Sequence, residues 1–165
     1  MSASPVDPLP TERTGTSTTP PPSVRFWESK RNNVGAILAI LAGVMTLGFK
    51  MWGIAVPQAR GDLGFFWGIL AVVIGAAYLW GFFSADKHWQ RARTILFAAA
   101  GIHILTGLAS GLFADAQGLS GMFPAALYDL VPAAIAIAAA FLIGKPPTPS
   151  EYREMHAADH AHGRG

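Results

Sequence analysis

Three ionisable residues, Lys50, His103 and Asp129, lie inside long apolar stretches of this sequence. Burying a charge is unfavourable unless the charge is paired, and ionisable residues in such stretches often mark ion paths, proton relays or ligand sites. A lysine and an aspartate can form an ion pair, and a histidine can exchange protons near neutral pH or ligate a metal. These three residues are therefore the candidate functional residues.

Lys50 and Asp129 have spacings that turn both of them toward small residues. Lys50 follows Gly43 by seven residues and Asp129 precedes Ala133 by four, which are same-face spacings on a helix. At the helical rise Lys50 lies about 7.5 Å from the carboxy-terminal end of its stretch and Asp129 about 9 Å from the amino-terminal end of its own, and both ends are predicted to be on the outer side. Matched depth and opposite charge predict an ion pair. The alternative for Lys50 is extension to the lipid headgroups on its long stem, whereas Asp129 needs a partner, a proton or water.

His103 precedes Gly107 by four residues, so it also faces the small-residue side of its stretch. We favour a hydrogen bond from His103 to a neighbouring carbonyl. Haem ligation is the alternative. Because the apolar stretches contain no second histidine, ligation would require a single axial ligand or a ligand from another subunit. The residues alone identify no cofactor.

Two histidines near the end of the chain, His156 and His160, are four residues apart and would share one face of a helix. We favour a solvated tail, with transition-metal binding by this pair as the alternative. The chain has no cysteine, which excludes disulfides and thiolate metal sites. No phosphate-binding loop, nucleophile elbow or zinc-protease motif occurs. The sequence therefore favours a non-enzymatic protein, and His103 and Asp129 are the acid–base candidates for an enzymatic one.

The elements that carry these residues are predicted from the apolar stretches. Hydrophobic residues make up 52% of the chain and charged residues 13%, against about 25% charged residues in soluble domains. Four stretches of about 20 residues are each long enough to cross a bilayer core of about 30 Å as a helix. We predict helices over 34–55, 64–83, 93–113 and 123–144. The predicted fold class is all-α, an integral membrane four-helix bundle.

The domain organisation follows from composition and charge. Residues 25–145 are predicted to form the membrane domain, preceded by a disordered tail rich in Pro, Ser and Thr over 1–24 and followed by a histidine-containing tail over 146–165. Basic residues flank the first helix, the middle connection and the end of the fourth helix, and the other two connections contain only Arg60. The flanking residues are Arg25, Lys30, Arg31, Lys87, Arg91, Arg93, Lys145 and Arg153. The positive-inside rule places both termini in the cytoplasm. With a formal net charge of only +2, no nucleic-acid partner is expected.

Small residues recur on one face of each predicted helix. In lipid, such faces allow helices to pack closely, and we therefore expect one compact bundle. The Lys50–Asp129 pair would bring the first helix against the fourth. The small residues are Gly35, Ala39 and Gly43; Ala71, Gly75, Ala77 and Gly81; Gly107 and Gly111; and Ala133, Ala136 and Ala140.

The segment Gly48-Phe49-Lys50 near the outer end of the first helix, within four short helices and an inward amino end, resembles DoxX-type small membrane proteins. The resemblance implies an accessory partner of a quinone-linked or other redox system in the membrane, and not a stand-alone catalyst. We therefore expect a non-catalytic accessory subunit whose partners are the lipid bilayer and other membrane subunits or further copies of the chain. The alternative is a small transporter, channel or proton-coupled unit that uses Lys50, His103 and Asp129.

Overall fold

The computed structural model describes residues 20–55, 63–116 and 130–162, and all regular structure in this part of the chain is helical. This confirms the predicted all-α class for the described residues. The helices are α1 (Pro22–Glu28), α2 (Lys30–Ala55), α3 (Leu63–Ser84), α4 (Trp89–Ala116), α6 (Leu130–Leu142) and α7 (Pro149–His162).

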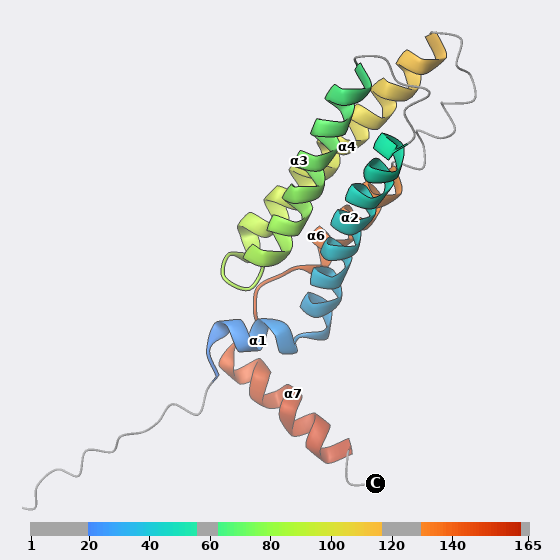
Figure 1. Cartoon of the computed structure of the whole chain (residues 1–165). Helices are drawn as coiled ribbons and strands as arrows, with labels where there is room; N and C mark the ends of the chain where they lie inside the picture. The colour runs from blue at the N-terminus through green and yellow to red at the C-terminus, as the bar shows by residue number, and fades with distance from the viewer. Residues whose placement is uncertain (1–19, 56–62, 117–129, 163–165) are drawn as a thin grey trace, which may run out of the picture.

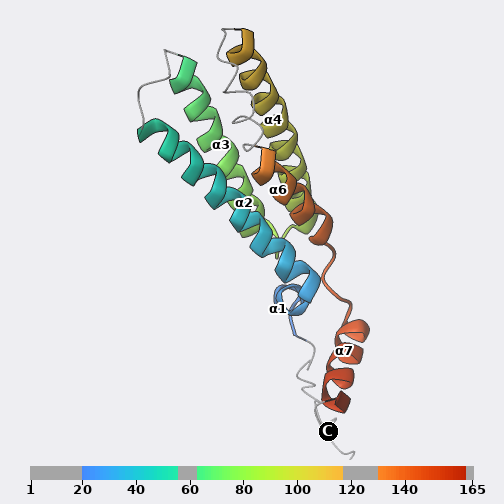
Figure 2. The same ribbon diagram turned by 90° about the vertical axis from the view of Figure 1, so that its right-hand side faces the viewer.

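Four of the helices, α2, α3, α4 and α6, run alternately up and down and pack as a ring (Figures 1 and 2). Each contacts two neighbours, because α2 and α4 both pack against α3 and against α6. The expected contact between the first and the fourth long helix, α2 and α6, is therefore confirmed. Helix α1 lies across one end of this bundle, and α7 extends away from it beyond α1 (Figure 1).

The helices begin earlier than the apolar stretches do. Both α2 and α4 start four residues before the predicted starts at 34 and 93. The predicted starts were placed by hydropathy, whereas a helix is defined by its backbone hydrogen bonds. These bonds continue through polar residues: the backbone N–H of Asn33 donates to the Ser29 carbonyl at 2.9 Å. Helix α3 agrees with its prediction to one residue at each end. Residues 123–129 of the fourth predicted helix lie outside the described residues.

The amino-terminal segment also differs from its prediction. Residues 1–19 lie outside the described part, but α1 begins at Pro22, so the last residues of the predicted disordered tail are helical. Proline is well tolerated at the first helical position because its missing N–H would have no partner there. Phe26 is buried, and the Trp27 ring contacts Phe82 with centroids 5.6 Å apart. These aromatic contacts hold α1 against the bundle.

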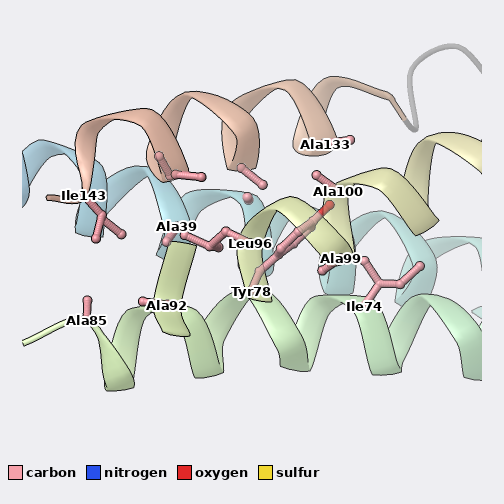
Figure 3. Close-up of a cluster of buried hydrophobic side chains, with 14 of the residues drawn as sticks. Ala39, Ile74, Tyr78, Ala85, Ala92, Leu96, Ala99, Ala100, Ala133 and Ile143 are labelled. Atoms are coloured by element: carbon pink, nitrogen blue, oxygen red, sulfur yellow. The ribbon is translucent and has the colours of Figure 1, made fainter. Parts of the chain in front are cut away.

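Small residues make up most of the bundle interior, as predicted (Figure 3). These small residues allow the helices to approach one another closely. A Cβ added to Gly35 would lie 2.9 Å from Leu142 Cβ and 3.0 Å from the backbone nitrogen of Ile143, so α2 touches α6 at the backbone. At the crossing of α2 and α3, a Cβ on Gly43 would lie 2.8 Å from Leu79 Cδ2. Close contact between helix backbones is the packing mode of bundles rich in small residues.

Large apolar side chains point outward from all four bundle helices. Two segments of the described residues, Lys30–Gly48 and Trp89–Ala109, are long and apolar enough to span a membrane, and Gly68–Ser84 and Leu130–Leu142 are apolar but shorter. The exposed apolar residues of the bundle are Val34, Ile37, Leu41 and Val44; Ile69, Val72, Val73, Trp80 and Phe83; Ile102, Leu105, Leu108 and Leu112; and Val131 and Phe141.

Candidate functional site

A buried tyrosine–histidine pair lies inside the bundle. The Tyr78 hydroxyl of α3 and Nδ1 of His103 of α4 are 3.1 Å apart, and the two residues are 0% and 3% exposed. The tyrosine ring lies across the core, with its oxygen toward Ala100 (Figure 3). His103 therefore faces the interior, as its spacing from Gly107 predicts. The structure gives His103 a hydrogen bond with a tyrosine hydroxyl, a partner that the sequence did not predict.

The chemistry of this pair depends on where its proton lies. If Nδ1 is unprotonated, the Tyr78 hydroxyl donates to it. If Nδ1 carries a hydrogen, it donates to the phenolic oxygen. Because the hydroxyl can rotate and both donates and accepts, it can follow either state of the imidazole. The pair can therefore hold a proton within an apolar interior without leaving this contact unsatisfied.

Tyr78 was not among the residues singled out from the sequence, because a tyrosine in an apolar stretch reads as an ordinary core aromatic. Its position does contain a signal. Tyr78 follows Gly75 by three residues and Ala71 by seven, so it shares the small-residue face of α3. The sequence signal for this pair is a hydroxyl-bearing residue, Tyr78, on the inward face of one helix together with His103 on the inward face of the next.

The expected Lys50–Asp129 ion pair lies outside the described residues, because Asp129 and the side chain of Lys50 are not part of them. One turn before Lys50, Thr46 is buried and its hydroxyl donates to the Ala42 carbonyl at 2.8 Å. This bond within α2 satisfies the hydroxyl locally.

A second group of polar residues joins the two ends of the chain at the α1 end of the bundle. We call it the terminal cluster: Arg25, Glu28, Arg31 and Asn32, with the residues of 141–156 that they contact. The last carbonyls of a helix have no partner within the helix and favour cationic neighbours. Arg31 donates to the Phe141 carbonyl in the last turn of α6 at 2.6 Å. The backbone amide of Gly144, just after α6, donates to Asn32 Oδ1 at 2.9 Å, so the start of α2 also holds the segment that follows α6.

Beyond α6, the cluster continues to α7. Arg25 donates to the Pro147 carbonyl at 2.5 Å. The Glu28 carboxylate lies 2.6 Å from His156 Nε2 and also accepts a hydrogen bond from Tyr152. The Tyr152 and His156 hydrogen bonds hold the pKa of the Glu28 carboxyl below its ordinary value of 4.5. Nothing local in the sequence pairs these residues, since Glu28 and His156 are 128 positions apart.

Of the two histidines that were considered as a metal site, the structure describes the side chain of one. His156 contacts the Glu28 carboxylate, and the side chain of His160 lies outside the described residues. Among the described residues no group of three or more His, Cys, Asp or Glu side chains is arranged to hold a metal ion.

Comparisons with known proteins give no relative: no family model, no curated protein and no solved structure matches the chain.

Proposed function

We propose that this chain is a multi-pass integral membrane protein of the cell membrane that serves as a non-catalytic accessory subunit of a membrane complex. The observation that carries the proposal is the distribution of side-chain size. Alanine makes up most of the buried core, with a few large residues such as Leu96 and Ile143, while fifteen large apolar residues of the bundle helices are exposed. A soluble bundle has the opposite pattern, with large apolar residues inside and polar residues outside.

The exposure of large apolar side chains favours lipid, and not water, around the bundle. Leu105 is 68% and Phe83 69% exposed, and removing such a side chain from water contributes about 1.5–3 kcal/mol. Only 39% and 33% of the residues of the two candidate spans are buried inside the protein. A core helix of a soluble protein would be mostly buried, and large exposed apolar surfaces mark membrane or protein interfaces.

Charge supports an orientation. The eight basic residues that flank the predicted helices all belong to α1, the first turn of α2, the turn and first residues of α4 after α3, or the segment after α6. All these parts lie at the end of the bundle where α1 and α7 lie (Figure 1). By the positive-inside rule this end is cytoplasmic, with both termini on that side.

The subunit role is supported by α1 and α7, which lie beyond one end of the bundle (Figure 2). Inside the bundle, Tyr78 hydrogen-bonds with Nδ1 of His103, and the Thr46 hydroxyl donates to a carbonyl of its own helix. The segment Gly48-Phe49-Lys50 resembles DoxX-type proteins. On the basis of this resemblance, we propose that the complex is a quinone-linked redox complex.

A single charge on the outward face tests the membrane location. Leu105→Lys should prevent stable insertion, because a lysine at the centre of a membrane helix costs about 2.5–3.5 kcal/mol. Met155→Lys, at a 41% exposed position of α7, is the matched control and should insert normally. The readout is resistance to alkaline carbonate extraction. If Leu105→Lys behaves like the control, the outward face does not meet lipid and the proposal fails.

Purification from native membranes in mild detergent tests the subunit role. We expect other membrane subunits to co-purify at fixed stoichiometry, together with a haem or quinone spectrum. Recovery of the chain only as copies of itself would contradict the proposal.

A second candidate, a proton-coupled unit or small transporter, is favoured by the buried Tyr78–His103 pair. In it His103, with Lys50 and Asp129, would form a polar path. In proteoliposomes containing a pH-sensitive dye, His103→Gln, Tyr78→Phe and Asp129→Asn should each reduce proton flux. His88→Gln, outside the bundle core, is the control. Flux that is absent, or unchanged in His103→Gln, would exclude this candidate.

A further inference from the structure

We propose that the junction between the start of α2 and the end of α6 binds the phosphate group of an anionic phospholipid through three exposed cations, Lys30, Arg31 and Lys145. The proposal names a ligand for the α1 end of the bundle, and it rests on the membrane location proposed above.

Hydrogen bonds between α2 and the end of α6 bring these cations together. Arg31 donates to a carbonyl in the last turn of α6 at 2.6 Å. The next residue, Asn32, accepts through Oδ1 from the amide of Gly144 at 2.9 Å, and Lys145 follows Gly144 in the chain. Lys30 precedes Arg31 and begins α2. Cations that are more than 110 positions apart in the sequence therefore share one side of the bundle end.

The positive charge of this junction is not balanced by ion pairs. Among the described residues, none of the three cations is within ion-pair distance of a carboxylate. The acidic side chains nearest in the chain have other partners. Glu28 accepts hydrogen bonds from two side chains of α7. The pKa of Glu151 is lowered by hydrogen bonds from Thr148 and, to a smaller extent, by the charge of Lys145. The junction therefore favours an anion.

Hydrogen-bond donors are also in surplus at the junction. The side chains of Arg25 and Asn32 both hold the segment after α6, through the Pro147 carbonyl and the Gly144 amide. Their remaining donors Arg25 Nε and Asn32 Nδ2 are buried and have no acceptor among the described residues. An ionised phosphate diester offers only acceptor oxygens and forms short, charge-assisted bonds with guanidinium and ammonium groups. The surplus of donors therefore matches a phosphate group.

Exposed apolar side chains adjoin the cations, which favours a phospholipid over a free phosphate ion. Val34 is 48% exposed and follows Lys30 by four residues, so it lies one turn further along the same face of α2. Phe141, in the last turn of α6, is 59% exposed. The junction lies at the proposed cytoplasmic end of the bundle (Figure 1). Basic pockets between membrane helices on this side bind acidic lipid headgroups, and acyl chains would contact the apolar side chains.

Native mass spectrometry of the full-length chain in detergent measures lipid binding directly. We expect phosphatidylglycerol to bind about tenfold more tightly than phosphatidylcholine with the same acyl chains, because only the first has a net negative charge. Glycerol phosphate, which has the phosphate but no acyl chain, should not displace phosphatidylglycerol at equal concentration. If it does, the site binds free phosphate esters and the assignment to a lipid is wrong.

Two double variants separate the junction from the general charge of this end. Lys30→Gln with Lys145→Gln removes two cations of the junction. Lys87→Gln with Arg91→Gln removes two from the turn after α3 and the start of α4, across the ring of helices. All four side chains are exposed, so we expect both variants to fold.

The two variants should differ in their affinity for phosphatidylglycerol. A cation near an anionic lipid contributes about fivefold, so the junction variant should lose about twenty-fivefold. The control variant should lose less than about twofold, because its cations are on the other side of the ring and are screened by salt. The proposal is overturned if the unmodified chain does not prefer phosphatidylglycerol, or if both variants lose affinity equally.

Failure of this proposal can be told apart from failure of the membrane location. Carbonate extraction of Leu105→Lys tests whether the outward face meets lipid, whatever the class of lipid. A chain that passes that test and binds phosphatidylglycerol no better than phosphatidylcholine contradicts the phosphate site alone.

Discussion

Thr46, Tyr78 and His103 show how polar groups are accommodated inside this bundle. In the membrane location that we propose, no water would complete an unsatisfied hydrogen bond, so partners would have to come from the protein. Thr46 uses a carbonyl of its own helix at 2.8 Å, and Tyr78 and His103 use each other across two helices at 3.1 Å. The Tyr78–His103 hydrogen bond links α3 to α4, so it also contributes to the packing of these two helices.

At the residue scale, Asn32 is the position where we expect the largest stability effect from one polar side chain. It is 2% exposed and accepts the hydrogen bond of the Gly144 amide. Asn32→Ala leaves that amide without its partner and should lower the free energy of unfolding by about 1–3 kcal/mol. The neighbouring exposed Asn33 is the control, and Asn33→Ala should change it by less than about 0.5 kcal/mol. Unfolding in mixed detergent and SDS measures both, and equal effects would contradict the role of Asn32.

Glycines of similar appearance in the sequence have opposite roles at the scale of helices. Gly35 lies where α2 meets α6, and an added Cβ would come within 3.0 Å of backbone that cannot move aside. Gly101 of α4 is also helical, but an added Cβ there meets nothing within 4 Å. The first glycine is required by packing, and the second only weakens its helix.

We expect the same substitution to have opposite signs at these two positions. Gly35→Ala should destabilise the bundle by about 1–3 kcal/mol through overpacking of α2 on α6. Gly101→Ala should stabilise it by about 0.5–1 kcal/mol, because alanine is the better helix former. Thermal unfolding of the two purified variants measures the difference. A stabilised Gly35→Ala variant would show that α2 and α6 are farther apart than described.

The helices and their inward faces could be predicted from the sequence because both follow from local periodicity. The spacing of Gly35, Ala39 and Gly43 indicates the buried side of α2, and the spacing of His103 from Gly107 indicates its inward direction. Partners could not be predicted in this way. Tyr78 and His103 are 25 positions apart, and Arg31 and Phe141 are 110 apart, so only the packing of the helices identifies them as neighbours.

For the whole molecule, the proposed orientation gives a labelling pattern. Single cysteines at Ser150 or Asp86 lie at the α1 end of the bundle and should be protected from a membrane-impermeant maleimide in intact cells. Cysteines at Ala59 or Gln117, in the two other connections, should react. Permeabilised cells are the control, since all four positions should react there. If Asp86→Cys is labelled in intact cells, the proposed orientation or the proposed number of membrane spans is wrong.

The terminal cluster has a consequence for how the protein is made. A chain is synthesised from its amino end, so Arg25, Glu28, Arg31 and Asn32 exist before the residues of 141–156 that they contact. Until α6 has entered between α2 and α4, the ring is open and these polar groups lack their carboxy-terminal partners. A chain cut short before Phe141 would remain in that state permanently. The contacts between residues 25–32 and 141–156 therefore form only after both segments have been synthesised, so they are among the late contacts of folding.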